Sequence, residues 1–160
     1  MNEGRIRTIV LGVFLHEGRL LVFRGDDPAR GVVFYRPLGG GIEFGERSTD
    51  AFIREMREEL GAEVTDIRYL GMIENIFTHL GKQGHEIVLL YAARFADPRF
   101  YTRQEWAGDD NGIAIQVLWK PLVDFENGAL LVPRVLLAML RGLAGPGRVP
   151  PSDEGYARAA

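Results

Sequence analysis

Two segments decide the fold of this chain: Gly39-Gly40-Gly41-Ile42-Glu43-Phe44-Gly45-Glu46 and Arg54-Glu55-Met56-Arg57-Glu58-Glu59-Leu60-Gly61. Three consecutive glycines cannot form regular structure without an entropic penalty, so the first segment predicts a loop. The second segment predicts the end of a helix over Ser48–Leu60, with Ser48 as N-cap and Gly61 at the C′ position. The pattern is therefore a glycine loop that leads into an amphipathic helix.

The predicted helix has an acidic edge beside an apolar face. Residues three and four positions apart are neighbours on a helix, so the carboxylates of Glu55, Glu58 and Glu59 fall within an arc of about 100°. The adjoining arc is apolar and must face the core; it contains Phe52, Ile53, Met56 and Leu60. The carboxylates therefore emerge along the edge of a packed helix.

These clustered carboxylates are unfavourable unless a cation lies near them. Two carboxylates about 4 Å apart repel each other by about 1 kcal/mol in water and by about 4 kcal/mol near a protein surface. The macrodipole also disfavours anions near the helix C-terminus. Arg54 and Arg57 can neutralise part of this charge, as on an ordinary solvated Glu/Arg face. A divalent metal does so far better, and an all-oxygen set suits Mg²⁺ or Mn²⁺ over Zn²⁺.

The spacing of the two segments resembles the Nudix box of the MutT-like hydrolases. The chain reads Gly40, five residues, Glu46, seven residues, then the second segment from Arg54 to Gly61, and it matches the box at every fixed position. It departs from the family at the last box position, where Ala62 replaces a larger aliphatic residue. The entry to the loop reads Pro37-Leu38-Gly39 where many members have Leu-Pro-Gly.

The resemblance implies an α/β class fold, an α/β/α sandwich around a mixed sheet. It also implies the roles of the box residues. The Mg²⁺ (or Mn²⁺) ligands are expected to be Glu55, Glu58 and Glu59, with the carbonyl of Gly40 as a further ligand. Glu46 and Arg54 resemble the pair that braces the loop against the helix.

The implied reaction is hydrolysis of a diphosphate linkage in a nucleoside diphosphate joined to another group, or in a (deoxy)nucleoside triphosphate. Metals that bridge phosphate oxygens neutralise developing charge and lower the pKa of a bound water. The alternative function is a nucleotide sensor of the same fold that binds without turnover. Such sensors typically lose box carboxylates, and this chain keeps them all.

The general base varies within the family, and several acids qualify. Glu55 or Glu59 can serve, and so can three acids of the segment Asp97–Gly112, which we expect to be a functional loop or partly disordered because of its length. Those acids, which can equally be solvated surface groups, are Glu105, Asp109 and Asp110.

Arg24 and Arg36 lie at predicted strand ends near the glycine loop, so they are candidates for substrate phosphates or for surface ion pairs. Aromatic side chains such as those of Tyr35, Phe77 and Trp106 can stack a base or belong to the core.

The pattern of the remaining chain predicts mainly strands. Strands are expected at Arg5–Leu15 and Leu20–Arg24 around a turn at Glu17-Gly18, at Val32–Tyr35, at Val64–Phe77 and Glu86–Phe95 around a turn at Thr78–His85, and at Ile113–Trp119. A second helix is expected over Val132–Leu143, with Pro133 in its first turn. Residues 1–144 are expected to form one Nudix domain and residues 145–160 a flexible tail.

Composition limits the partners of this 160-residue chain. Its net charge of −3 argues against a broad electrostatic grip on nucleic acid or anionic membrane, so the expected partner is a small nucleotide. The absence of cysteine excludes disulfides and thiolate metal sites. No apolar run approaches a membrane span, and the N-terminal run is too short for a signal peptide, so we expect a cytoplasmic protein. A homodimer through the second helix stays open, although that helix can simply cover the sheet.

Overall fold

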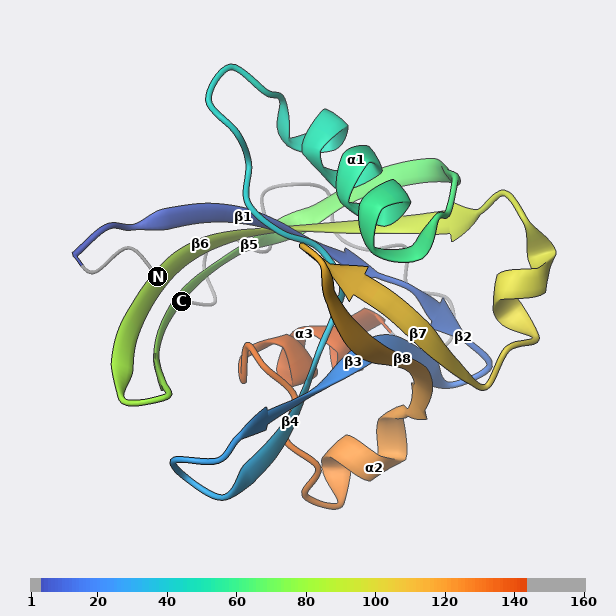
Figure 1. Ribbon diagram of the computed structural model, residues 1–160. Helices are drawn as coiled ribbons and strands as arrows, with labels where there is room; N and C mark the ends of the chain where they lie inside the picture. The colour runs from blue at the N-terminus through green and yellow to red at the C-terminus, as the bar shows by residue number, and fades with distance from the viewer. Residues whose placement is uncertain (1–3, 144–160) are drawn as a thin grey trace.

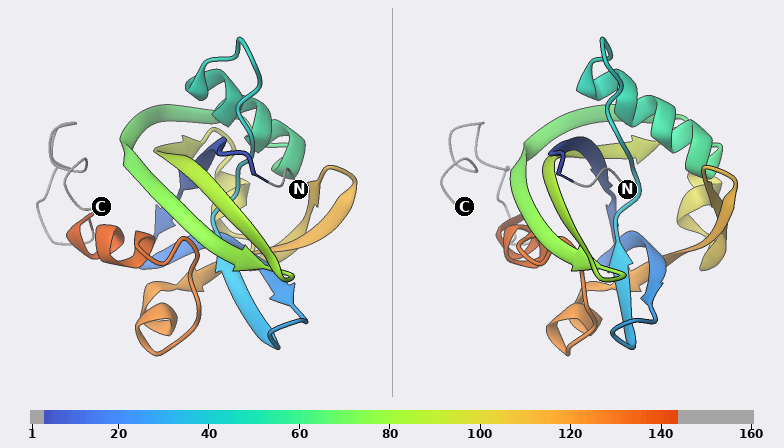
Figure 2. Two further views of the ribbon diagram at one scale, coloured as in Figure 1. Left: turned by 90° about the vertical axis from the view of Figure 1, so that its left-hand side faces the viewer. Right: turned by 60° about the vertical axis from the view of Figure 1, so that its left-hand side comes forward.

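Residues 4–143 form two β-sheets with helices on opposite sides, as the computed structural model in Figure 1 shows. In chain order the elements are β1 (Arg7–Val13), β2 (Leu15–His16), β3 (Arg19–Asp27), β4 (Val32–Arg36), α1 (Ser48–Leu60), β5 (Val64–His79), β6 (Lys82–Phe95), η1 (Pro98–Tyr101), β7 (Glu105–Asp110), β8 (Ile113–Pro121), α2 (Leu122–Glu126) and α3 (Leu136–Leu143). Helix α1 lies on one side of the strands, and α2 and α3 lie on the other (Figures 1 and 2). The predicted α/β/α sandwich is confirmed. The predicted tail 145–160 lies outside the described residues.

Strand β1 is buried on both faces and separates two hydrophobic cores. Its side chains alternate, so Ile9, Leu11 and Val13 enter the core that α3 closes, whereas Val10 enters the core under α1. Such a strand has a continuous apolar sequence because neither face meets water. This explains why the run near the N-terminus is continuously apolar.

The first sheet has the order β1-β6-β5, in which β1 and β6 are parallel and β5 and β6 are antiparallel. The long β5–β6 hairpin turns at only two residues, Leu80 (φ 50°) and Gly81 (φ 76°). Two positive φ values in succession are typical of a tight hairpin turn whose twist matches the strands. The predicted turn over Thr78–His85 was therefore too wide, because the polar residues at the end of the hairpin still pair.

The second sheet is antiparallel, with the order β2-β3-β8-β7 and with β4 paired to β3. The turn predicted at Glu17-Gly18 is confirmed, but it joins only the two-residue strand β2 to β3. Strand β1 instead pairs with β6 in the other sheet. The sequence could not separate β1 from β2 because their apolar run is nearly continuous.

The segment Asp97–Gly112 is largely regular structure and not the loop, functional or partly disordered, that its length predicts. It contains η1 and strand β7, and β7 pairs with β8 from Glu105↔Leu118 to Asp110↔Ile113. The strand is hard to recognise because it contains Gly108 and three acids in place of an apolar alternation. This ordered edge strand matters for the site described below.

The bounds predicted for α1 are confirmed, but Ser48 is not its N-cap. Arg47 precedes the helix without a side-chain cap, and the hydroxyl of Ser48 shares a 2.6 Å hydrogen bond with the hydroxyl of Tyr91. At the other end Gly61 adopts the left-handed conformation (φ 65°) and its N–H donates to the Arg57 carbonyl, as predicted for a C′ glycine.

The second predicted helix begins later than expected. Helix α3 starts at Leu136, so Pro133 precedes the helix, and the short helix α2 was not predicted. The side chains of Leu136 and Leu140 are buried in the core, which shows that α3 covers the sheet. None of the helices in residues 4–143 is long and apolar enough to span a membrane.

Two glycine-to-alanine changes should have opposite effects on the stability of the protein, one in a packed core and one on an open helix surface. A Cβ at Gly12 would lie 2.6 Å from the ring of Phe52 and 2.9 Å from that of Phe14, so Gly12→Ala should destabilise the protein by about 1–3 kcal/mol. Gly142 lies in α3, and a Cβ added there would have no neighbouring atom within 4 Å, so Gly142→Ala should stabilise by about 0.5–1 kcal/mol. Urea unfolding of both variants measures this, and equal effects would contradict the packing described.

Candidate functional site

Arg54 joins the glycine loop to the acidic edge of α1. Its Nε and Nη2 donate to the two carboxylate oxygens of Glu46 at 2.8 and 2.9 Å, and Nη2 also donates to the Gly41 carbonyl at 2.9 Å. Its Nη1 donates to Glu55 at 2.8 Å and to Glu58 at 3.2 Å. The planar guanidinium thus holds three carboxylates and one backbone carbonyl in a fixed arrangement. This is the bracing geometry expected of Glu46 and Arg54.

The loop end of this arrangement is strongly ionised. Hydrogen bonds from Arg54, and then the backbone N–H of Glu43 at 3.0 Å, lower the pKa of Glu46 to about 2. The hydrogen bonds to Glu46, and secondly the one to Glu55, raise the pKa of Arg54 above its ordinary value. Glu46 is therefore a permanent anion at neutral pH and serves to hold the loop rather than to exchange protons.

Glu55 and Glu59 are buried at the helix end of the arrangement. Glu59 is 5% exposed, and its Oε2 accepts a 2.8 Å hydrogen bond from the N–H of Gly39. Burial, and secondly the charge of Glu55, raises the pKa of Glu59 to about 8 against the opposing effect of the Gly39 N–H. Burial also raises the pKa of Glu55 despite its bond to Arg54. Two buried carboxylates with raised pKa values favour a cation beside them.

The glycine loop is shaped by its contacts with β1 and α1. The carbonyl of Gly40 accepts a 2.9 Å hydrogen bond from the N–H of Val10, which leaves one of its two lone pairs for another partner. A Cβ at Gly40 would lie only 2.5 Å from Oε1 of Glu55. The close approach of backbone to carboxylate that the sequence predicts is therefore present, and a larger residue at position 40 would displace the Glu55 carboxylate.

The predicted metal ligands are only partly gathered. Glu55 and Glu59 are both buried, whereas the Glu58 side chain is 55% exposed and forms an ion pair with Arg54. Within residues 4–143 no three acidic or imidazole groups converge as a ready metal cluster. Arg57 does not neutralise the site, because it pairs with Glu63 at 2.7 Å. The buried oxygen donors with raised pKa values nevertheless fit a hard divalent cation, to which Glu58 could turn.

Strand β7 decides which of its acids reaches the site. Its side chains alternate, so Glu105 and Asp109 are exposed while Asp110 points to the α1 side. Glu105 accepts a hydrogen bond from Gln116 at 2.8 Å, and Asp109 accepts one from the Gly112 N–H at 2.6 Å. The charge of Asp110 contributes to the raised pKa values of both Glu55 and Glu59. Of the three acids, Asp110 alone acts on the buried carboxylates.

A glycine allows this strand to lie against the helix. A Cβ at Gly108 would be 2.8 Å from the backbone carbonyl oxygen of Glu59. Because side chains two residues apart share a face, the approach at Gly108 places Asp110 on the same side of the strand. Trp106 of that face packs against Phe100 and belongs to a hydrophobic core.

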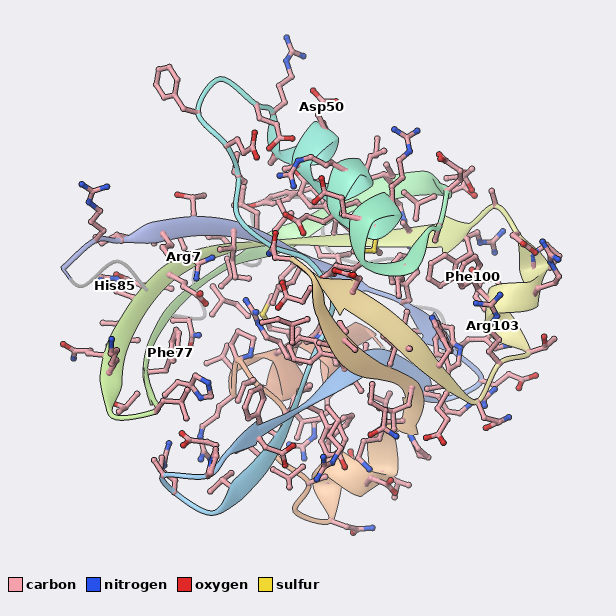
Figure 3. The ribbon with its side chains drawn as sticks, in the orientation of Figure 1. Arg7, Asp50, Phe77, His85, Phe100 and Arg103 are labelled. Carbon is pink, nitrogen blue, oxygen red and sulfur yellow. The ribbon has the colours of Figure 1, made fainter. Side chains whose placement is uncertain are left out.

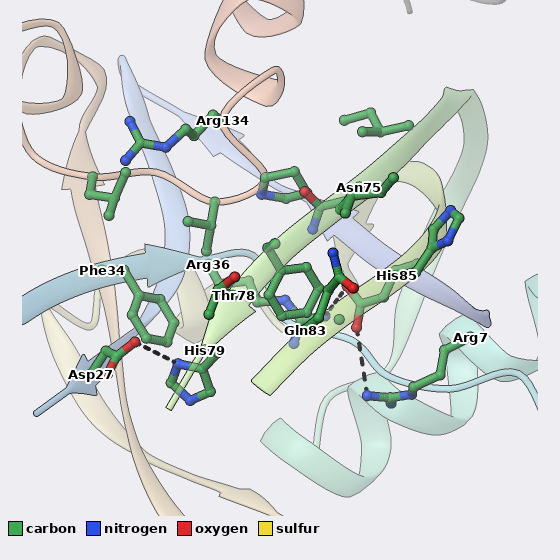
Figure 4. Close-up of a pocket in the computed structure, with 18 of the residues that line it drawn as sticks. Arg7, Asp27, Phe34, Arg36, Asn75, Thr78, His79, Gln83, His85 and Arg134 are labelled. Carbon is green, nitrogen blue, oxygen red and sulfur yellow. Dashed lines mark ion pairs between the residues drawn. The ribbon is translucent and has the colours of Figure 1, made fainter. Parts of the chain in front are cut away.

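A cleft of about 640 Å³ opens beside the site, and Asp110 is among the residues that line it. Its walls come from β3 and β4 on one side and from the β5–β6 hairpin on the other (Figure 4). At the outer end the two hairpins touch, since the N–H of Leu80 donates to Asp27 at 3.3 Å and Arg30 donates to the carbonyl of Thr78 at 3.4 Å. The cleft therefore extends from Asp110 toward the two hairpin tips.

Of the two arginines predicted to meet phosphates, Arg36 lines the cleft. Arg24 instead pairs with Asp26 at 2.9 Å. Arg7 also lines the cleft and was missed, because a lone arginine at the start of a strand matches no motif. Figure 3 shows Arg7 on β1 and Phe77 on the β5–β6 hairpin, whose strand β6 pairs with β1.

The aromatic candidates separate in the same way. Phe77 lines the cleft together with Phe34 and His79. The rings of Phe34 and His79 meet edge to face, with 5.6 Å between their centroids. Tyr35 packs against Phe125 in the core. Tyr35 and Trp106 are thus core residues, which is one of the two alternatives that the sequence left open.

In this α/β/α sandwich, an arginine braces a glycine loop against a helix that bears buried carboxylates. This combination is typical of MutT-like Nudix proteins. Residues 5–130 match the family model described as the NUDIX domain. The chain belongs to the Nudix family.

Relatives and solved structures agree with this assignment. The chain is 29% identical over 133 residues to the NAD-capped RNA hydrolase NudC of Pseudomonas aeruginosa (strain LESB58), which covers 79% of this chain and 45% of that protein. It therefore spans less than half of this curated relative. Its fold is similar to that of the MutT NUDIX hydrolase from Burkholderia pseudomallei (TM-score 0.58, 20% identity, 85% of this chain and 97% of the other). It is also similar to the E. coli ORF135 protein (TM-score 0.61, 19% identity, 90% and 96%).

The Glu46–Arg54 pair predicts a pH-dependent contribution to stability. The pKa of Glu46 falls from 4.5 to about 2 on folding, so this contribution is complete above pH 4.5 and is lost as the pH falls toward 2. Glu46→Gln should therefore lower the free energy of unfolding most at pH 7 and progressively less below pH 4.5. Urea unfolding of both proteins at pH 7, 4 and 3 measures the difference. A difference that is independent of pH would contradict the charged pair.

Proposed function

We propose that this chain is a divalent-metal-dependent hydrolase that cleaves a diphosphate linkage in a nucleoside diphosphate derivative or in a (deoxy)nucleoside triphosphate. The observation that carries the proposal is the pair of buried carboxylates, Glu55 and Glu59, beneath a glycine loop and beside a cleft that contains arginines. Buried acids with raised pKa values are costly for stability and concentrate at functional sites. The complete Nudix box supports the same assignment.

We propose Glu55, Glu58 and Glu59 as the residues that hold Mg²⁺ or Mn²⁺, with the free lone pair of the Gly40 carbonyl as a further donor. An all-oxygen set is what these two ions prefer. When bound, such ions neutralise phosphate charge and lower the pKa of a coordinated water. Arg54 restrains Glu55 and Glu58 through its Nη1, and the Gly39 N–H restrains Glu59. These contacts preorganise the carboxylates on the helix edge.

We propose Asp110 as the general base of the reaction. It lines the cleft, and its charge acts on Glu55 and Glu59. Its Oδ1 accepts a hydrogen bond from Asn111, and within the described residues its Oδ2 accepts none. Glu105 and Asp109 face the opposite side of β7 and are engaged with Gln116 and Gly112. Asp110 can therefore accept a proton at a carboxylate oxygen from a water that attacks phosphorus in the cleft.

The substrate within this class is best sought with a panel. Nucleoside triphosphates, ADP-ribose, dinucleoside polyphosphates, NADH and a short NAD-capped RNA cover the main chemistries of the leaving group. The capped RNA is included because relatives from two Pseudomonas species bear the name NAD-capped RNA hydrolase. The negative net charge favours a small nucleotide over a long RNA. A sensor without turnover would bind a panel member with Mg²⁺ but release no phosphate, pyrophosphate or nucleoside monophosphate.

Glu59→Gln tests the carboxylate site. Loss of one charged ligand should lower kcat/KM by about 100-fold or more. A bound metal stabilises the charge of the transition state by several kcal/mol, and about 1.4 kcal/mol corresponds to a tenfold change in rate. It should also reduce the rise in Tm on addition of Mg²⁺. Glu63→Gln is the matched control, since Glu63 pairs with Arg57 on the surface just beyond the helix. Equal rates for the native chain and Glu59→Gln would remove the enzyme assignment.

Two neighbouring residues of β7 separate the candidate bases. Asp110→Asn should lower kcat by about 10²- to 10⁴-fold, the usual contribution of a general base. Asp109→Asn should leave kcat within about threefold of the native value, because its side chain faces away from the site. Steady-state kinetics at saturating substrate and Mg²⁺ measure both. Full activity of Asp110→Asn would return the role to Glu55 or Glu59.

A further inference from the structure

The ring of Phe77 lies flat on the strand that pairs with its own. Phe77 of β5 and Gly84 of β6 are register partners in the β5–β6 hairpin. A Cβ at Gly84 would be nearest to Cζ of this ring and only slightly farther, 2.7 Å, from both of its Cε atoms. These distances place the Cβ above Cζ, because a point in the plane of the ring would be much farther from the two Cε atoms. One face of the Phe77 ring therefore covers Gly84.

The opposite face of the Phe77 ring is turned to the cleft. Phe77 lines the cleft and is only partly buried. Within residues 4–143 no other aromatic ring and no cation packs on it. Nucleobases stack on aromatic faces of this kind, and every base can do so because each has a π face. The free face of Phe77 is therefore a candidate platform for a base.

Phe34 and His79 close the cleft beyond Phe77. The ring of Phe34 covers Gly25 on the paired strand, much as Phe77 covers its own glycine. Figure 4 shows the ring of Phe34 from β4 next to that of His79 from β5, and this edge-to-face contact joins the two hairpins. His79 also lies 3.5 Å from the buried carboxylate of Asp27. A base on Phe77 is thus limited on its outer side by two rings that are held in place.

Asn75 supplies a polar group next to this platform. Side chains alternate along β5, so Asn75, Phe77 and His79 share the half-buried face, whereas Ile76 between them is 61% exposed. Asn75 lines the cleft, and within the described residues its side-chain amide makes no hydrogen bond. An amide offers a donor and an acceptor side by side, which is the pattern that matches the edge of a base.

The same strand pair connects the platform to the phosphate end of the cleft. Asn75 is the register partner of Glu86, whose carboxylate lies 3.6 Å from Arg7 and 3.8 Å from Arg36. The charge of Arg36 also reaches the acidic edge of α1, so these arginines lie where the phosphates of the hydrolysed linkage are expected. The step from Asn75 to Phe77 is about 7 Å along the strand, which leaves room for a sugar between the phosphates and the base.

We propose that the base of the substrate stacks on the free face of Phe77 and that Asn75 hydrogen-bonds its edge, while the linkage that is hydrolysed lies toward α1. The inference rests on the proposed function and deepens it, because it selects substrates that carry a nucleobase and gives their direction in the cleft. Gly84 is a positioning residue, since it acts only through the ring that lies flat on it.

Binding without metal or turnover tests the base platform. Calorimetry in EDTA compares AMP, GMP, CMP and UMP with ribose 5-phosphate, which has the sugar and the phosphate but no base. At least one nucleotide should bind about 10- to 100-fold more tightly than ribose 5-phosphate, the amount that stacking of one base on an aromatic ring supplies. If no nucleotide binds more tightly than ribose 5-phosphate, the proposal is wrong.

Variants of the hairpin assign this preference to the ring. Phe77→Leu should reduce the affinity ratio of nucleotide to ribose 5-phosphate by about tenfold, whereas Phe77→Tyr keeps a ring and should stay within about threefold of the native ratio. Gly84→Ala should also reduce the ratio, because its Cβ would displace the ring. Met72→Leu is the matched control on β5, since Met72 is 46% exposed and does not line the cleft. An unchanged ratio in Phe77→Leu, even with both affinities lowered, would overturn the proposal.

Asn75→Ala tests the contact with the edge of the base. It should lower the affinity for the preferred nucleotide by about 3- to 10-fold, as expected for one or two neutral hydrogen bonds, and leave that for ribose 5-phosphate unchanged. The loss should be smaller for the other nucleotides, because their edges match the amide less well. An equal loss for all four nucleotides, or no loss, would remove Asn75 from the site.

Hydrolysis with Mg²⁺ then separates this inference from the proposed function. Nucleoside triphosphates and ADP-ribose carry a base, whereas 5-phosphoribosyl 1-diphosphate carries a diphosphate without one. Higher kcat/KM for a substrate with a base, with KM raised and kcat nearly unchanged in Phe77→Leu, supports the inference, because stacking is the same before and in the transition state. Equal kcat/KM with and without a base would overturn it and leave the hydrolase assignment intact. Base-dependent binding without turnover of any compound would instead remove the hydrolase assignment.

Discussion

The geometry of the site depends on one guanidinium group. Arg54 bonds simultaneously to Glu46 on the loop, to Glu55 and Glu58 on the helix, and to the carbonyl of Gly41. Without it, three carboxylates would repel one another next to a glycine loop that has little intrinsic conformational preference. Because the guanidinium is planar and permanently charged, it sets both the position of the loop and the direction in which the acids point. Lysine offers no equivalent fork.

The two-sheet architecture converts this local motif into a site with a cleft. Helix α1 packs over β1, and β7 lies against the helix through Gly108, so the acidic edge is enclosed on one side. On the other side the β3–β4 and β5–β6 hairpins approach at their tips and leave the arginine-lined space between them. The acidic edge of the helix and the arginines of the cleft therefore belong to neighbouring parts of one surface, and Asp110 lies where they meet.

Sequence reasoning located the parts of the site that are local in the chain. The helix bounds and the C′ glycine follow from periodicity and spacing. The bracing roles of Glu46 and Arg54 were implied by the family resemblance, and their hydrogen bonds agree with it. The box pattern also indicated the family, which the comparison with the NUDIX domain model confirms. The box pattern does not show that the Glu58 side chain is 55% exposed and pairs with Arg54, because exposure depends on how the helix packs.

What the sequence by itself determined, therefore, is the glycine loop and the acidic helix, which rest on periodicity and on contacts between near neighbours, whereas the α/β class followed from the family resemblance of the box. Only the tertiary structure decided that β7 is a strand with Asp110 on its inner face, and that Glu86 meets Arg7 and Arg36. These groups are separated by tens of residues. Their meeting depends on which strands pair and in which register, and a shift of one residue would turn each side chain to the opposite face.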